Sequence, residues 1–164
     1  MNTDLTDMRK YVTQLLETYH KRARQIAVLR YELSNPQKIT ENEMLDVMQF
    51  ARPEGSGRTV GHISNKTLHI ALNYREQAAR INAESLDEIS RELVSLMEEQ
   101  DRLEYFVSLL EPRQEKVLRR TCFERVPQET VAEELGVTVR RVQNIKSQAI
   151  DELAEMYGLA ANRK

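Results

Sequence analysis

Several residue types that point to particular classes of protein are scarce in this 164-residue chain. It has one cysteine, Cys122, no tryptophan and three phenylalanines. A single cysteine excludes a disulfide within the chain and is typical of proteins from a reducing cytosol. Glycine occurs five times and proline four times, and charged residues make up 30% of the chain. This composition favours a soluble, mostly helical protein.

Signals for membranes, metals and catalysis are missing from the sequence as well. No apolar run approaches the roughly 20 residues of a membrane span, and the first ten residues, MNTDLTDMRK, hold no signal-peptide core. We therefore expect a cytoplasmic protein that does not bind membranes. His62 and His69 have no cysteine or acid paired to them, so we expect no metal site. Because no nucleophile with a base and no cofactor fingerprint occurs, we predict no enzymatic activity and no cofactor.

The stretch from Thr130 to Leu153, TVAEELGVTVRRVQNIKSQAIDEL, has the pattern of a helix-turn-helix. A short helix is predicted over 128–135, and Gly136 ends it because glycine readily adopts a positive φ at a helix end. Val137 fills the corner, and Thr138 is placed to cap the following helix. Apolar residues recur at helical spacing in that second helix: Val142, Ile145, Ala149, Ile150 and Leu153.

The polar face of the second helix has the chemistry of a base-reading surface. No acid interrupts its basic and amide residues between Thr138 and Gln148. Arginine pairs with guanine O6 and N7, and Gln or Asn pairs with adenine N6 and N7. A merely solvated amphipathic hairpin is the alternative, but the offsets of Ala132 and Gly136 favour binding of double-stranded DNA. The outward residues are Arg140, Arg141, Gln143, Asn144 and Lys146.

The last third of the chain resembles the fourth conserved region of bacterial sigma-70-type factors, which recognises the promoter −35 element. The resemblance rests on LEPRQEKVL from Leu110 to Leu118, then TVAEELGVT, then RRVQNIKSQAIDEL. It implies that the last of these segments is the recognition helix. Sigma factors often have arginine at the position of Val139, so we expect a different preferred base step here. The residues carried over are Val139, Arg140, Arg141, Gln143 and Asn144 toward bases or phosphates, and Thr130 and Thr138 toward the DNA backbone.

A complete sigma factor also melts promoter DNA, and the residues for this task are missing ahead of Leu110. Unpaired bases are held by aromatic stacking platforms in electropositive grooves. The chain has no tryptophan and no basic–aromatic cluster in that part. We therefore interpret the protein as sigma-like but without a promoter-melting domain.

Residues 1–109 have the pattern of a helical scaffold, which makes the expected fold all-α. Apolar residues recur at spacings of three and four over 5–33, interrupted only at Arg22, and over 86–110, interrupted only at Gln100. Each series covers about four heptads and is typical of a coiled-coil-like seam.

The charges of the two seam helices are complementary. Residues 20–30 are basic without an acid, whereas residues 84–104 are mainly acidic. Opposite charge on helices of similar length favours an antiparallel pair, either within one chain or between two.

The predicted helices of the scaffold cover about 4–34, 41–50 and 64–110, with a Gly-rich loop at 51–63. The loop contains no phosphate-binding glycine motif, and we interpret it as a connector. The helix-turn-helix domain is expected at 110–158, followed by a flexible tail at 159–164. The middle segments GHISNKT and ALNYRE are similar to phage-encoded late-gene activators of the autolysin-regulatory-protein type, which join a helical front to a sigma-like tail.

Two classes of function stay open. In the first, the protein is a sequence-specific transcriptional regulator that binds promoter DNA, while its helical front forms a homodimer or touches RNA polymerase. In the second, it is a phage DNA-packaging subunit of the small-terminase kind, or another DNA-binding assembly protein whose helical front builds a ring. The opening LEPRQEKVL favours the regulator, because a packaging subunit needs only a generic helix-turn-helix.

Overall fold

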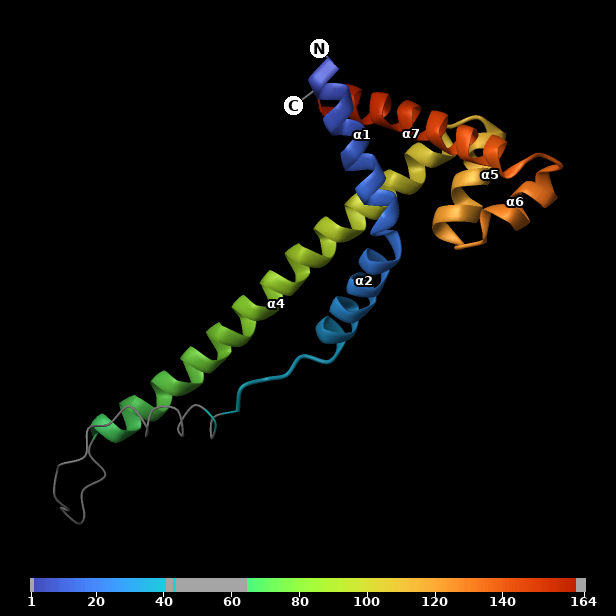
Figure 1. The fold of residues 1–164 in the computed structure, drawn as a ribbon. Coiled ribbons are helices and arrows are strands. Elements are labelled where there is room, and N and C mark those ends of the chain that lie inside the picture. Colours follow the sequence, from blue (N-terminus) through green and yellow to red (C-terminus); the bar gives the residue numbers. More distant parts are fainter. Residues whose placement is uncertain (1, 41–42, 44–64, 162–164) are drawn as a thin grey trace, which may run out of the picture. The chain divides into compact units, whose positions relative to one another are not determined.

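The structure is a computed structural model that describes residues 2–40, 43 and 65–161 (Figure 1). Every regular element in these ranges is helical, so the all-α prediction is confirmed for the described part of the chain. Only Glu43 of the helix predicted at 41–50 is described, and the loop predicted at 51–63 lies outside the described residues. The elements are α1 (Asn2–Glu17), α2 (Tyr19–Ser34), α4 (Asn65–Ser108), α5 (Pro112–Leu118), the π-helix η1 (Arg119–Phe123), α6 (Gln128–Leu135) and α7 (Val139–Ala161).

The first predicted helix, 4–34, is two helices in the structure, with an interruption at Thr18. The hydroxyl of Thr18 donates a hydrogen bond to the carbonyl of Gln14 (2.7 Å). Such a bond from a threonine to the preceding turn is a common cause of helix bending. Arg22 Nη2 donates to the carbonyl of Leu15 (3.0 Å), which gives this acceptor at the interruption a side-chain partner.

Two other helix ends differ from the prediction by a few residues. Helix α4 ends at Ser108 rather than at 110, because the N–H groups of Leu109 and Leu110 donate to carbonyls only three residues back, which tightens the last turn. Helix α7 continues through Ala161, three residues into the predicted tail. Its last residues contain no proline and follow the buried Tyr157, so nothing ends the helix at 158. Residues 162–164 lie outside the described part.

The chain divides into two compact units, one of residues 1–27 and 94–164 and the other of residues 28–93. In the first unit, α1 packs against α7, so segments from both ends of the chain share one core (Figure 1). The predicted boundary at residue 109 runs through this core, because its buried residues come from both sides of it. They include Val12, Leu15, Leu103, Val107, Leu118, Ala149 and Leu153.

The two polar residues that interrupt the apolar seams pair with each other inside the first unit. Arg22 is 4% exposed and Gln100 is 7% exposed, and Arg22 Nε donates to Gln100 Oε1 (2.8 Å). Arg22 Nη1 also lies 3.5 Å from Glu99 Oε2. A buried polar pair of this kind fixes the register of two packed helices. At this point the two seams therefore meet within one chain, one of the two arrangements that the sequence leaves open.

The second unit joins the end of α2 to α4 through a short extended segment. Helix α2 ends at Ser34, as expected from Pro36. The backbone N–H of Ile39 then donates to Asn82 Oδ1 (3.1 Å) on α4. This bond holds the segment after α2 close to α4 within the unit.

Candidate nucleic-acid interface

The corner between α6 and α7 has the hydrogen bonds of a Schellman motif. Gly136 adopts the left-handed conformation (φ 63°, ψ 37°), as predicted. The N–H of Val137 donates to the carbonyl of Ala132 (2.9 Å), and the N–H of Gly136 donates to that of Glu133 (3.1 Å). These bonds satisfy carbonyls that the helix end leaves without partners, and glycine pays no Cβ penalty in this conformation.

Thr138 caps the start of α7, also as predicted. Its hydroxyl accepts from the N–H of Arg141 (3.2 Å), and its carbonyl accepts from the N–H of Val142 (3.1 Å). A side-chain oxygen that accepts from the third helical residue is the usual N-cap arrangement. The first turn of α7 is thus held by its own capping residue.

A small apolar core fixes the angle between α6 and α7. Val131, Ala132, Val142 and Ile145 are buried together with Val117 of α5. Leu135, Val137 and Val139 pack against this cluster with part of their surface exposed. The residues that the sequence pattern assigned to the inside of the helix-turn-helix therefore face one another.

The predicted contact residues of α7 fall into two groups by exposure. Arg140, Arg141, Gln143 and Asn144 are exposed, and so are Thr130 and Thr138. Arg140, Gln143 and Asn144 share one side of α7, because residues three and four apart are neighbours on a helix. Val139 and Lys146 are only half-exposed.

Val139 and Lys146 are turned toward the protein rather than toward the centre of the exposed face. Val139 packs against the apolar core of the corner. Lys146 lines a cavity of about 230 Å³ together with Thr13, His20 and Cys122. The roles predicted for these two residues in DNA contact stay predictions, and their partial burial places them at the edge of the exposed face.

The acidic charge of α6 is partly paired with a basic residue of η1. Arg120 forms an ion pair with Glu134 and another with Glu124. The hydrogen bond from Arg120 keeps the pKa of Glu134 below its usual range. Glu134 is therefore ionised and held beside a guanidinium, which reduces the repulsion that its charge would exert on a nearby polyanion.

Sequence reasoning missed two residues next to the exposed face of α7. Gln128, the first residue of α6, accepts a hydrogen bond at Oε1 from Nε2 of Gln143 (3.2 Å). Arg9 of α1 donates to Ser147 Oγ (2.8 Å) and forms an ion pair with Asp151. The position of Gln128 at the start of the first helix of the motif was a signal in the sequence that could have identified it. Nothing in the local pattern pointed to Arg9, which lies 138 residues from Ser147.

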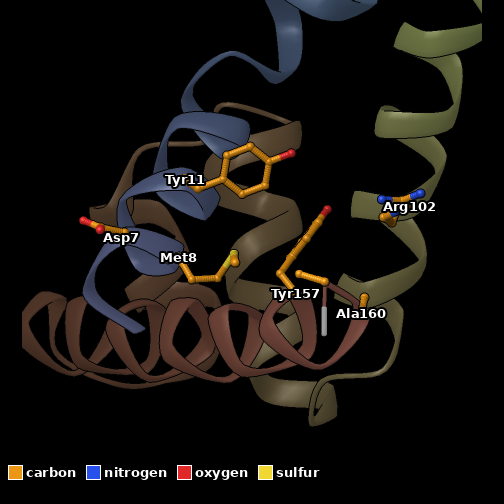
Figure 2. A pocket seen from close by; sticks show the side chains of 7 residues that line it. Asp7, Met8, Tyr11, Arg102, Tyr157 and Ala160 are labelled. Carbon is orange, nitrogen blue, oxygen red and sulfur yellow. The ribbon is translucent and has the colours of Figure 1, made fainter. Parts of the chain in front are cut away.

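A second cavity lies at the other end of α7 (Figure 2). It measures about 420 Å³ and contains none of the predicted contact residues. The rings of Tyr11 and Tyr157 meet edge to face there, with centroids 5.7 Å apart, and Arg102 of α4 lies opposite (Figure 2). Burial raises the pKa of the Tyr157 hydroxyl. This cavity is separate from the candidate interface.

A capped corner, an apolar core beneath it and an exposed basic and amide face define a helix-turn-helix DNA-binding module. Comparison with known families identifies the kind of helix-turn-helix module: residues 107–159 match Sigma-70, region 4. The chain thus contains a Sigma-70 region 4 domain in its C-terminal third, and domains of this family are non-catalytic DNA-binding modules. No curated protein and no solved structure matches the chain.

Two further findings concern the described residues as a whole. None of their helices is long and apolar enough to cross a membrane. Within the same ranges, no group of three or more His, Cys, Asp or Glu residues is placed to hold a metal ion.

Proposed function

We propose that this protein is a sequence-specific transcriptional regulator that binds promoter DNA through α7. The observation that carries the proposal is the exposed face of Arg140, Gln143 and Asn144 on a helix that belongs to a Sigma-70 region 4 domain. An exposed basic and amide face at the start of a helix-turn-helix recognition helix suits the major groove, where each base pair presents a distinct pattern. The net charge of −2 means that attraction to DNA is local to this face.

The proposal includes RNA polymerase as a partner, because the Sigma-70 region 4 domain points to a role in transcription. The similarity of the middle segments to phage late-gene activators supports the same assignment. Co-purification with RNA polymerase from host cells tests this part, and a variant with Arg140→Ala controls for bridging through DNA. Recovery of polymerase that disappears after nuclease treatment would contradict a direct contact.

A homodimer stays part of the proposal, but the seam within the first unit is already filled by residues of the same chain. Leu103 and Val107 pack in one core with Val12 and Leu15. Val94 and Tyr105 of α4, and Leu109 directly after it, have more than half of their surface exposed. Sedimentation of the purified protein distinguishes a regulator, expected as a monomer or dimer, from a packaging subunit, expected as a large ring.

The central prediction concerns base reading. Replacing Arg140 by Ala is expected to weaken specific binding by about 1–3 kcal/mol if this side chain reads a base. A genomic fragment that the native protein binds is first selected, and gel-shift titration of this cognate fragment against scrambled competitor then measures the loss of affinity. Arg102→Ala removes an exposed arginine at the other cavity and serves as the control. Equal affinity of the Arg140 variant and the native protein for the cognate fragment would refute the assignment.

A further inference from the structure

The hydrogen bond between Gln143 and Gln128 joins the exposed face of α7 to the start of α6. Gln143 Nε2 donates to Gln128 Oε1 at 3.2 Å, across 15 residues of sequence. Gln143 is exposed and Gln128 is half-exposed. A bond of this kind at the surface adds little to stability, because water competes for both groups. Its consequence lies in the orientation that it gives to the amide of Gln143.

The acceptor is held on a rigid element. Gln128 is the first residue of α6 and directly follows Pro127, whose φ is −56°. The carbonyl of Pro127 accepts from the N–H of Val131 (3.1 Å), so the backbone on both sides of Gln128 is fixed. The backbone of Gln143 is also fixed, since it lies within α7 and Val142 beside it is fully buried. The two ends of the bond therefore keep their relative positions.

This bond occupies one of the hydrogen-bonding groups of Gln143 and leaves the other donor and the acceptor of its amide available. A glutamine amide has two N–H donors and one carbonyl acceptor. With one N–H directed to Gln128, one donor and one acceptor remain for DNA. Adenine offers the matching pair in the major groove, an acceptor at N7 and a donor at N6, whereas guanine offers acceptors at both N7 and O6.

We propose that Gln128 is a positioning residue that makes Gln143 select adenine over guanine. This inference rests on the proposed function, because it requires α7 to lie in the major groove. In the absence of Gln128, both N–H groups of Gln143 are free to turn toward N7 and O6 of guanine. Gln128 thus sets the base preference through Gln143 without itself contacting the base.

The experiment compares two substitutions that separate this role from a general effect on affinity. Gln128→Met keeps the length of the side chain but removes the acceptor. Gln128→Glu keeps an oxygen acceptor and adds a negative charge, which weakens binding to all DNA sequences alike. The operator position read by Gln143 is found first, as the position whose preference disappears in Gln143→Ala when randomised duplexes are selected.

Fluorescence anisotropy with duplexes that carry adenine or guanine at that position then gives an affinity ratio for each protein. The native ratio is expected to be about tenfold or more in favour of adenine, the range of one bidentate pair. We expect Gln128→Met to lower the ratio several-fold at this position alone, and Gln128→Glu to keep the ratio while overall affinity falls. In the native protein, 7-deazaadenine, which lacks the N7 acceptor, should bind more weakly than adenine.

Each failure has its own meaning. An unchanged ratio in a folded Gln128→Met variant overturns the inference, and so does a guanine preference in the native protein. Circular dichroism and thermal melting establish that the variants are folded, and should the Met variant unfold, loss of the ratio in the Glu variant overturns the inference instead. If the native protein shows no sequence preference at all, the proposed function itself fails, which is a separate result.

Discussion

At the scale of single residues, the buried arginine of the first unit joins the two apolar seams. Arg22 is almost fully buried, and its guanidinium donates to Gln100, to the carbonyl of Leu15 and to the hydroxyl of Thr18 (3.1 Å). A buried charge is tolerated only when such partners satisfy its donors. The two polar residues that interrupt the apolar repeats are thus hydrogen-bond partners, which accounts for the presence of both in a buried seam.

Removing one partner from this pair is expected to cost more than removing both. Gln100→Ala leaves Arg22 Nε without its acceptor and should lower the free energy of unfolding by about 1.5–3 kcal/mol. The combined change Arg22→Met with Gln100→Leu replaces the pair by apolar groups and should be close to neutral. Urea unfolding measures both, with the exposed Gln148→Ala as control. A double variant that is less stable than Gln100→Ala would contradict this account.

At the scale of elements, the corner of the helix-turn-helix depends on one backbone conformation. Gly136 has a positive φ, and no heavy atom lies within 4 Å of where its Cβ would be. Substitution there meets no steric obstacle from neighbouring atoms, so its cost comes from the backbone alone. Arg125, in the segment before α6, is a non-glycine residue that also has a positive φ (56°). The first helix of the motif therefore ends at a left-handed residue, and another left-handed residue lies three positions before its start.

Two glycines in this domain are expected to respond in opposite directions to the same substitution. Gly136→Ala places a Cβ in the left-handed region and should destabilise the domain by about 1–2 kcal/mol. Gly158→Ala lies within α7, where its Cβ would also meet nothing within 4 Å, and should stabilise it by about 0.5–1 kcal/mol. Thermal unfolding of both variants is the measurement. A stabilising effect at both positions would show that Gly136 is not held in the left-handed conformation.

At the scale of the whole molecule, the first helix of the chain belongs to the same unit as α7. Helix α1 contributes Val12, Leu15 and Leu16 to the core that α7 shares, and Arg9 connects it to Asp151. A Sigma-70 region 4 domain is matched from residue 107 onward. Its core is nevertheless completed by side chains from the first 27 residues. We therefore expect the stability of the Sigma-70 region 4 domain to depend on α1.

A substitution in α1 tests this dependence. Leu15→Ala should destabilise the unit by about 2–5 kcal/mol, because Leu15 is 4% exposed in the shared core. Leu5→Ala on the same helix removes a side chain that is 51% exposed and should change stability little. Hydrogen exchange of the amides of α7 measures the coupling directly. Unchanged protection of α7 in the Leu15 variant would mean that the two parts are stable independently.

The helix-turn-helix could be predicted from the sequence because its determinants are local. Gly136, Thr138 and the apolar spacing from Val131 to Leu153 all act within a few turns of one another. The helix bounds were less predictable. The hydroxyl of Thr18 donates to a carbonyl of the preceding turn where the first helix is interrupted, and the spacing of apolar residues contains no sign of this bond. Of the two residues at the edge of the face, Val139 was assigned from the sigma-like resemblance and Lys146 from its place on the polar face of the helix.

Only the tertiary structure decided which distant residues meet. Arg22 donates a hydrogen bond to Gln100, 78 residues away in the sequence, and Arg9 donates to Ser147, 138 residues away. Gln143 donates to Gln128 across the corner of the motif. Periodicity indicates which face of a helix is apolar, but it does not identify the helix that will cover that face. The sequence by itself determined the helical character of the chain and the chemistry of the exposed face of α7. The pairing of these helices follows from packing that brings together segments far apart in the chain. The orientation of the Gln143 amide likewise depends on the packing of α6 against α7.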